Sequence, residues 1–204
     1  RLMTHFACAD EPDHPATLQQ LAVFKQTIGD AIGEISIANS AGVVGWPQSH
    51  GDWIRPGLAL YGVSPITAGR SAQHKLRPMM TFSSSVIAVR PVKKGDAVGY
   101  GATWIAPRDT RLAIVAIGYG DGYPRNAPCG TPVLINGVRY PIVGRVSMDM
   151  TTVDIGDAEI EHGAQVVLWG EQLPVEEIAE LVQTIPYELL CNITSRVQFR
   201  YISD

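Results

Sequence analysis

The sequence has 204 residues, 46% of them hydrophobic and 18% charged, which is enough apolar chain for a sizeable core in one or two domains. Its net charge of -4, with lysines and arginines scattered along the chain, excludes the concentrated basic surface that binds nucleic acid or an anionic membrane. Cys8, Cys129 and Cys191 form no CxxC pair, and no membrane-length apolar run or signal-peptide pattern is present, so we expect no metal, no disulfide framework and a cytoplasmic location.

The first 70 residues alternate apolar runs with a helical pattern, as parallel α/β structure does. Residues 2–8, 35–39 and 54–61 predict strands. Residues 15–33 predict a helix that starts at a proline suited to a first turn and continues with apolar residues at mostly helical spacing. Because a (β/α)₈ barrel takes eight strand-helix units and typically ~250 residues, this part is expected to be incomplete on its own.

Residues 64–77 are polar and mark a candidate linker, so we place the domain boundary between residues 70 and 71. The pattern then changes to that of antiparallel β-structure, with predicted strands at 86–92, 112–117 and 165–169. Asn136-Gly137 separates further apolar runs at 131–135 and 138–143, and Asn-Gly in such a place is the strongest short signal for a hairpin. One helix is predicted from 174 to 184, with an apolar stripe formed by Val175, Ile178, Ala179 and Val182.

Four segments combine Gly, Tyr, Arg and Asp where a plain core would not need them: WIRPGLALYG, VGYGATW, IGYGDGYPR and VGRVSMDM. Loops on a rigid scaffold are where binding and catalytic residues usually lie. Each segment alone also has a simpler interpretation, since glycines form tight turns, tyrosines pack half-buried and Arg–Asp pairs form surface ion pairs. The segments are informative together, through their order and spacing.

In that order and spacing the four segments resemble the motifs of the alanine racemases, and THFACADE and IANSAG near the start match two more. The resemblance extends over essentially the entire chain. It implies α/β plus all-β structure, in which residues 1–70 are the C-terminal part of a (β/α)₈ barrel that binds pyridoxal 5′-phosphate (PLP) and residues 71–204 are a mostly antiparallel β domain. It also implies an isomerase that interconverts L- and D-alanine through a PLP aldimine and supplies D-alanine as a peptidoglycan precursor.

Racemisation removes the Cα proton from one face of the substrate and returns a proton to the other, so two acid/base groups must flank the Cα atom. The resemblance implies that Tyr100 of VGYGATW is one of them and that the lysine holding PLP is the other. A free phenol ionises only near pH ~10, so neighbouring groups must stabilise its anion. The resemblance assigns that support to His5 and Arg55, and it places Arg55, a permanent cation and pure donor, beside the pyridine nitrogen.

Phosphate binding needs donors that reach dianionic oxygens, and backbone N–H groups at glycine-bearing turns provide them. By resemblance, the residues that bind the cofactor are Asn39, Ser40, Arg55, Gly57 and Leu58. Without the resemblance, Ser40 would be interpreted as a helix cap. Also by resemblance, the residues that reach the substrate from the partner subunit are Tyr119, Met148 and Asp149, with Met148 acting through its backbone N–H. Tyr100 would likewise work in the partner subunit's site, so a homodimer is implied.

The chain departs from the best-known family members in three ways. Ser195 stands where some relatives have a tyrosine that confines the substrate pocket, which predicts a wider pocket. Ser36 stands where some have a histidine beneath Arg55, so different or weaker support of Arg55 is expected. None of the four lysines lies in a context like that of the PLP lysine, which the resemblance assigns to a preceding barrel region. We therefore expect this chain alone to be inactive and to lack the visible absorbance of bound PLP.

Three alternatives stay open. A racemase of broader specificity is favoured by Ser195 and would turn over lysine, arginine or serine as well as alanine. A binding or assembly module could have kept the motifs by descent without catalysing a reaction. A PLP-dependent decarboxylase of related architecture fits VGYGATW and SMDM less well, and likeness of fold alone does not decide the chemistry.

Overall fold

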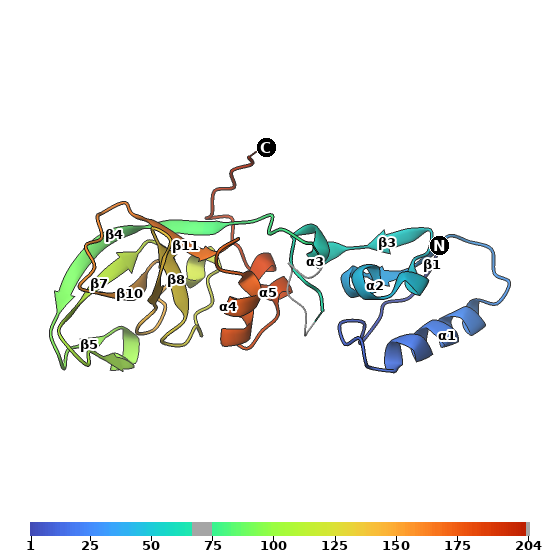
Figure 1. The fold of residues 1–204 in the computed structure, drawn as a ribbon, viewed down its shortest axis with the longest axis horizontal. Helices are drawn as coiled ribbons and strands as arrows, with labels where there is room; N and C mark the ends of the chain where they lie inside the picture. The colour runs from blue at the N-terminus through green and yellow to red at the C-terminus, as the bar shows by residue number, and fades with distance from the viewer. Residues whose placement is uncertain (67–74, 203–204) are drawn as a thin grey trace. The chain divides into compact units, whose positions relative to one another are not determined.

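The computed structural model describes residues 1–66 and 75–202 and divides into two compact units, Arg1–Met79 and Met80–Asp204 (Figure 1). The predicted domain boundary between residues 70 and 71 lies outside the described residues. Among the helices that are described, none combines the length and the apolar character that a bilayer crossing needs.

The first unit contains a three-stranded parallel sheet in the order β1-β2-β3. Its elements are β1 (Leu2–Met3), α1 (Ala16–Ile28), β2 (Ile35–Asn39), α2 (Ser40–Gly45), the 3₁₀ helix η1 (Pro47–Ser49), β3 (Trp53–Arg55) and α3 (Gly57–Leu60). A small core forms around Phe6, Leu21, Ile37 and Trp46. The Trp46 indole also donates to the Ala9 carbonyl at 2.9 Å, so the one polar atom of this side chain is paired inside the core.

The sequence predicted β2 correctly, but three other assignments in this unit were wrong or too long. The strand predicted over 2–8 ends at Met3, and the predicted helix ends at Ile28. At the next residue, Gly29, a φ of 47° takes the backbone out of the helix. The strand predicted over 54–61 stops at Arg55, because Pro56 has no N–H to donate to a sheet, and α3 follows it.

The second unit is built around a six-stranded sheet in the order β10-β7-β4-β11-β8-β9, with every neighbouring pair antiparallel. The strands are β4 (Phe82–Val92), β7 (Thr110–Val115), β8 (Pro132–Ile135), β9 (Val138–Pro141), β10 (Thr151–Gly156) and β11 (Gln165–Trp169). A ribbon pairs β5 (Ala97–Val98) with β6 (Trp104–Ile105). Near the C-terminal end lie α4 (Val175–Leu181) and α5 (Pro186–Cys191).

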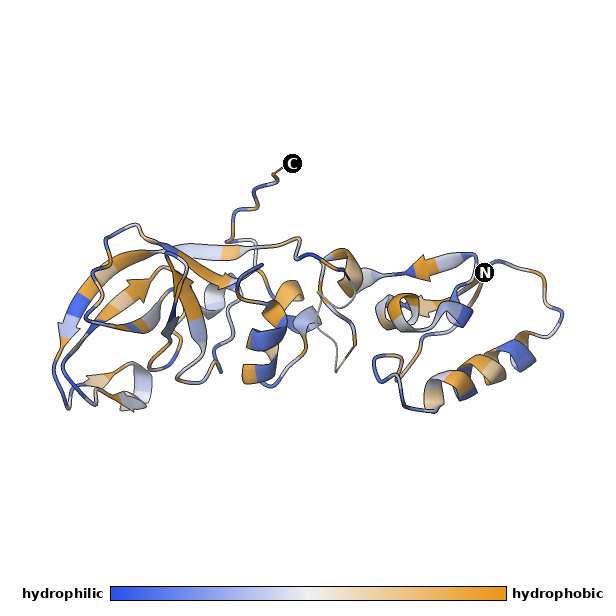
Figure 2. Ribbon diagram, viewed as in Figure 1, coloured by the Kyte–Doolittle hydropathy of each residue, from blue (hydrophilic) through white to orange (hydrophobic). Residues whose placement is uncertain are grey.

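This sheet curls until its two edge strands meet. Ile142, which follows β9, forms a β-bridge with Val153 of β10, and the Val143 N–H donates to the Thr152 carbonyl at 2.9 Å. The sheet is thus a nearly closed barrel, and closure pairs backbone groups that an open edge would leave exposed. Figure 2 shows β7 and β11 in mainly apolar colours, whereas α1 of the first unit alternates between polar and apolar bands.

The sequence predicted most of this second unit. The Asn136-Gly137 hairpin joins β8 to β9, and β11 has the predicted bounds. The stripe predicted on the helix that became α4 is buried, with Ile178 fully enclosed. The sequence did not predict β5, β6, β10 or α5. The strand β10 contains the buried Asp154, and α5 begins at Pro186.

Candidate active site

In the first unit, Arg55 at the end of β3 is held in place by four polar contacts. Its Nη1 donates to the Ser36 hydroxyl at 2.6 Å, and its Nη2 donates to the carbonyls of Thr4 at 2.8 Å and Ile37 at 3.1 Å. The His5 Nδ1 atom lies 3.4 Å from the same Nη2. The guanidinium therefore has a fixed plane, and the structure brings together the predicted pair His5 and Arg55. Ser36 is the different support expected for Arg55, in direct contact with it.

Two short helices begin side by side in this unit. Asn39 caps α2, because its side chain accepts from the Gly42 N–H at 2.9 Å, so the interpretation of Ser40 as the cap was wrong. The buried Ser40 hydroxyl accepts from the Ala59 N–H of α3 at 3.2 Å and joins the two first turns. Helix first turns carry backbone N–H groups without partners inside the helix, and Gly57 opens α3. The predicted cofactor-binding residues are thus brought together.

In the second unit, Tyr100 lies in the turn between β5 and β6, where the chain needs glycine. Gly99 and Gly101 have φ values of 77° and 74°, which only glycine adopts easily. A Cβ atom on Gly99 would lie 3.1 Å from the backbone nitrogen of Arg145, so the VGYGATW turn packs directly against the VGRVSMDM segment. Tyr100 is 68% exposed, so the residues that the structure describes do not enclose its side chain.

Tyr119 and Met148 lie on neighbouring loops joined by backbone hydrogen bonds. The Tyr119 N–H donates to the Ser147 carbonyl at 3.0 Å, and the Gly120 N–H donates to the Met148 carbonyl at 2.9 Å. A Cβ atom on Gly118 would lie 2.2 Å from the Ser147 carbonyl oxygen, so this approach requires glycine. The structure therefore brings together the predicted substrate residues of IGYGDGYPR and VGRVSMDM.

Sequence reasoning missed Arg196. This side chain contacts Asp121 at 3.2 Å and Asp149 at 2.5 Å, and hydrogen bonding to Asp149 raises the pKa of the guanidinium. The only available signal was the position of Arg196 beside Ser195 in CNITSRV, and spacing along the chain does not predict which carboxylates an arginine contacts. Ser195 itself is exposed.

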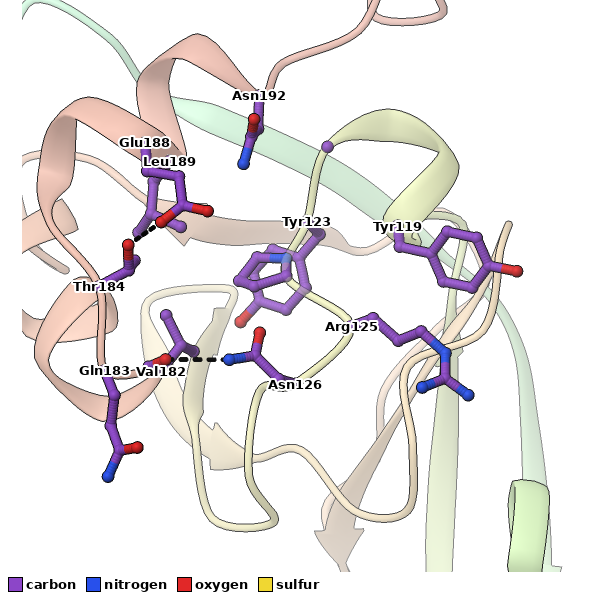
Figure 3. Close-up of a pocket in the computed structure, with 12 residues that line it drawn as sticks. Tyr119, Tyr123, Arg125, Asn126, Val182, Gln183, Thr184, Glu188, Leu189 and Asn192 are labelled. Atoms are coloured by element: carbon purple, nitrogen blue, oxygen red, sulfur yellow. Dashed lines mark hydrogen bonds between the residues drawn. The ribbon is translucent and has the colours of Figure 1, made fainter.

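A cavity of about 520 Å³ lies on one side of Tyr119, with mainly polar walls (Figure 3). Tyr123, Asn126 and Asn192 are among its lining residues, and the Asn126 amide donates to the Val182 carbonyl at 2.9 Å. The buried Tyr123 hydroxyl has no hydrogen-bond partner among the described residues, and burial raises its pKa. No cluster of metal-ligating side chains was found in the part of the chain that the structure describes.

The lysines lie where the sequence placed them. Lys25 is on the exposed side of α1, and Lys93 and Lys94 lie in an exposed turn after β4. Lys93 forms an exposed ion pair with Asp109 at 2.8 Å, which raises the pKa of the lysine and lowers that of the carboxyl. The fourth, Lys75, is exposed as well. Each of these lysines thus has an ordinary surface environment.

Comparison with known proteins gives one family over nearly the whole chain. A family profile described as "Alanine racemase, N-terminal domain" matches residues 1–65, and one described as "Alanine racemase, C-terminal domain" matches residues 79–201. An alanine racemase of Shewanella frigidimarina is 60% identical over 197 residues, which are 96% of this chain and 53% of that protein. One from Aeromonas hydrophila is 54% identical, covering 98% of this chain and 57% of that protein.

Solved structures of alanine racemases have the same fold as this chain. The biosynthetic alanine racemase of Pseudomonas aeruginosa superimposes with a TM-score of 0.94 at 48% identity, over 98% of this chain and 56% of that chain. The alanine racemase of Bartonella henselae, solved with covalently bound pyridoxal phosphate, gives a TM-score of 0.89 at 33% identity, over 98% of this chain and 56% of that chain. These matches confirm the predicted fold class, part of a barrel followed by an antiparallel β domain. The chain spans about half the length of its curated relatives, and it belongs to the alanine racemase family.

Proposed function

We propose that the full-length protein containing this chain is a PLP-dependent racemase that interconverts L- and D-alanine, and that this chain supplies Tyr100 as one of its two acid/base groups. The observation that carries the proposal is the fixed Arg55. Its guanidinium is anchored by Ser36 and by two carbonyls and lies beside His5, which suits the group that the resemblance assigns to the pyridine nitrogen. The lysine that completes the pair would come from outside these 204 residues.

The residues present fit PLP. An arginine carries five N–H donors, and the Nε–H of Arg55 has no partner among the described residues, so a donor remains for the pyridine nitrogen. The joined first turns of α2 and α3 offer backbone N–H groups suited to a phosphate. Asn39, Ser40, Gly57 and Leu58 would hold the phosphate in this way. When bound, PLP would withdraw electrons from the substrate and make its Cα proton acidic.

The second unit would act on the substrate. The Tyr100 hydroxyl would hold the proton on one face of the Cα atom, with its anion stabilised by the cation of Arg55 and by His5. The Met148 backbone N–H would bind the alanine carboxylate, with Tyr119 and Asp149 shaping the corridor beside it. Arg55, as a permanent cation, would keep the ring nitrogen unprotonated and limit how much negative charge the ring accepts.

We propose that these groups meet across a homodimer, so that Tyr100 of one subunit serves the partner subunit's His5 and Arg55. The 68% exposure of Tyr100 and the 50% exposure of Met148 support this arrangement, because a proton-transfer group in an active enzyme needs walls that exclude water. Closed two-fold dimers are the commonest assemblies that could provide such walls.

The test is racemisation by the full-length protein with PLP, measured as D-alanine formed from L-alanine. Tyr100→Phe removes the hydroxyl and keeps the ring, so kcat should fall by about 10²–10⁴-fold. Tyr201→Phe is the matched control, because Tyr201 is 94% exposed and near the C-terminus, and it should keep wild-type activity. A Tyr100→Phe enzyme as fast as this control would rule out the assigned role.

A broader specificity is the second candidate, favoured by the small and exposed Ser195. In the same assay it predicts that lysine, arginine or serine is racemised with a kcat/KM within about tenfold of that for alanine, a difference of ~1.4 kcal/mol. Release of CO₂ instead of the opposite enantiomer would indicate the decarboxylase alternative.

A further inference from the structure

Arg196 lies where three segments of the second unit meet. Its Nε contacts Asp121 Oδ1 at 3.2 Å, and its Nη2 donates to Asp149 Oδ1 at 2.5 Å. Asp121 follows Tyr119 in the loop after β7, and Asp149 follows Met148 in the loop before β10. One guanidinium thus connects the two loops that carry the proposed substrate residues, through two different nitrogens.

The fit around this guanidinium is close. A Cβ atom on Gly120 would lie 2.3 Å from Arg196 Nη1, so the arginine occupies space that any other residue at position 120 would fill. Thr194 ties the same segment to this turn, because its hydroxyl donates to the Gly120 carbonyl at 2.8 Å and its N–H donates to the Asp121 carbonyl at 3.2 Å. The Asp121 carboxylate is itself anchored, since it accepts from the Gly118 N–H at 2.9 Å.

We propose that Arg196 is a positioning residue, which sets the spacing between the Tyr119 loop and the Met148–Asp149 loop and thereby the recognition of the substrate carboxylate. The inference rests on the proposed function for its kinetic part. Its physical basis is that a guanidinium is a rigid planar fork, which can hold two carboxylates at a fixed separation, whereas a lysine ammonium is a single point of charge. Without the arginine, two like charges on adjacent loops would repel each other.

The competing view is that Arg196 forms an ordinary surface ion pair, and such pairs contribute little. Arg139 provides the comparison. It binds Glu177 through two nitrogens, at 2.6 and 3.0 Å, and joins β9 to α4 away from the motif loops. Both arginines are about half exposed, at 48% for Arg196 and 50% for Arg139. Arg139→Gln is therefore a control matched in chemistry and exposure but not in location.

The experiment compares Arg196→Gln, Arg196→Lys and Arg139→Gln in the full-length protein with PLP. Arg196→Gln should raise KM for alanine by about tenfold while kcat changes by less than about threefold, because the binding of the carboxylate is loosened and the proton-transfer groups are retained. The KM of Arg196→Lys for alanine should lie between those of the wild type and Arg196→Gln, because a lysine keeps the positive charge but cannot hold both carboxylates through two separate nitrogens. Arg139→Gln should leave KM unchanged.

Amide hydrogen exchange gives a readout that does not depend on activity. In both Arg196 variants, exchange of the Tyr119, Gly120 and Met150 amides should speed up, by about tenfold in Arg196→Gln, with the rest of the unit unchanged. Unchanged exchange in these amides, or an equal effect of Arg139→Gln, would overturn the proposal, and so would an unchanged KM in an active enzyme. If the wild-type protein has no racemase activity but amide exchange in these loops is still faster in the Arg196 variants, the proposed function fails while loop positioning by Arg196 is supported.

Discussion

At the scale of single residues, we propose roles in the site for two arginines, and the sequence points to only one of them. Arg55 stands in a family motif, and its Nη1 donates to the Ser36 hydroxyl at 2.6 Å. Arg196 could not be assigned, because its carboxylate partners lie 47 and 75 positions away in the chain and no periodicity links them. Residue types are visible in a sequence, whereas the pairing of distant charged groups requires the fold.

Tyr123 gives a residue-scale prediction. Because burial raises the pKa of its hydroxyl above that in the unfolded chain, the folded protein keeps this proton longer, and stability should be lost as pH rises above about 10, at up to ~1.4 kcal/mol per pH unit. Tyr123→Phe removes the titrating group and an unpaired buried hydroxyl. Urea unfolding at pH 8 should give a variant about as stable as the wild type.

At pH 11, the same titration should show the Tyr123→Phe variant to be the more stable protein. Tyr201→Phe, at an exposed site, should follow the wild type at both pH values. An alkaline loss of stability that is the same in Tyr123→Phe and in the wild type would contradict the assignment.

At the scale of elements, the sequence predicted best where the signal is local. The Asn136-Gly137 hairpin and the buried stripe of α4 depend on turn chemistry and helical spacing, and both were found. The prediction of a strand over 54–61 was wrong after Arg55, because a short apolar run is compatible with a strand or a helix. Pro56 ends the strand, and α3 begins at the next residue. The nearly closed barrel depends on the β-bridge between Ile142 and Val153, and no local sequence pattern predicts a contact between residues so far apart in the chain.

Gly118 gives an element-scale prediction, because the loops after β7 and before β10 touch through it. A Cβ atom there would lie 2.2 Å from the Ser147 carbonyl oxygen and 2.4 Å from that of Met148, so Gly118→Ala must push the loops apart. We expect a loss of about 3 kcal/mol in the free energy of unfolding, measured by urea denaturation of the full-length protein.

Gly33→Ala is the matched control for this clash. The added methyl group would meet only the Leu2 side chain, at 3.6 Å, which is ordinary van der Waals contact. Its stability should stay within ~1 kcal/mol of the wild type. If the two variants lose the same stability, the close approach of the two loops at Gly118 is not as described.

At the scale of the whole molecule, the proposed function assigns the cofactor-binding residues to the first unit and one acid/base group to the second. This division of roles follows from the family resemblance, through the order of the motifs along the chain, and stays a prediction. The chain's own four lysines are exposed on a helix and in turns, each in an ordinary surface environment. The central claim is therefore that Tyr100 is one member of a two-base pair whose other member lies elsewhere in the full-length protein.

The most direct test follows Cα hydrogen exchange in D₂O, using the full-length Tyr100→Phe protein with PLP and each enantiomer of alanine in turn. A site that has lost one of two bases can still remove and return the proton on the remaining face. We predict rapid deuterium incorporation into one enantiomer only, with racemisation slowed by about 10²–10⁴-fold, while Tyr201→Phe exchanges both enantiomers and racemises as the wild type does. Equally rapid exchange of both enantiomers by Tyr100→Phe, or racemisation as fast as that of Tyr201→Phe, would contradict the claim.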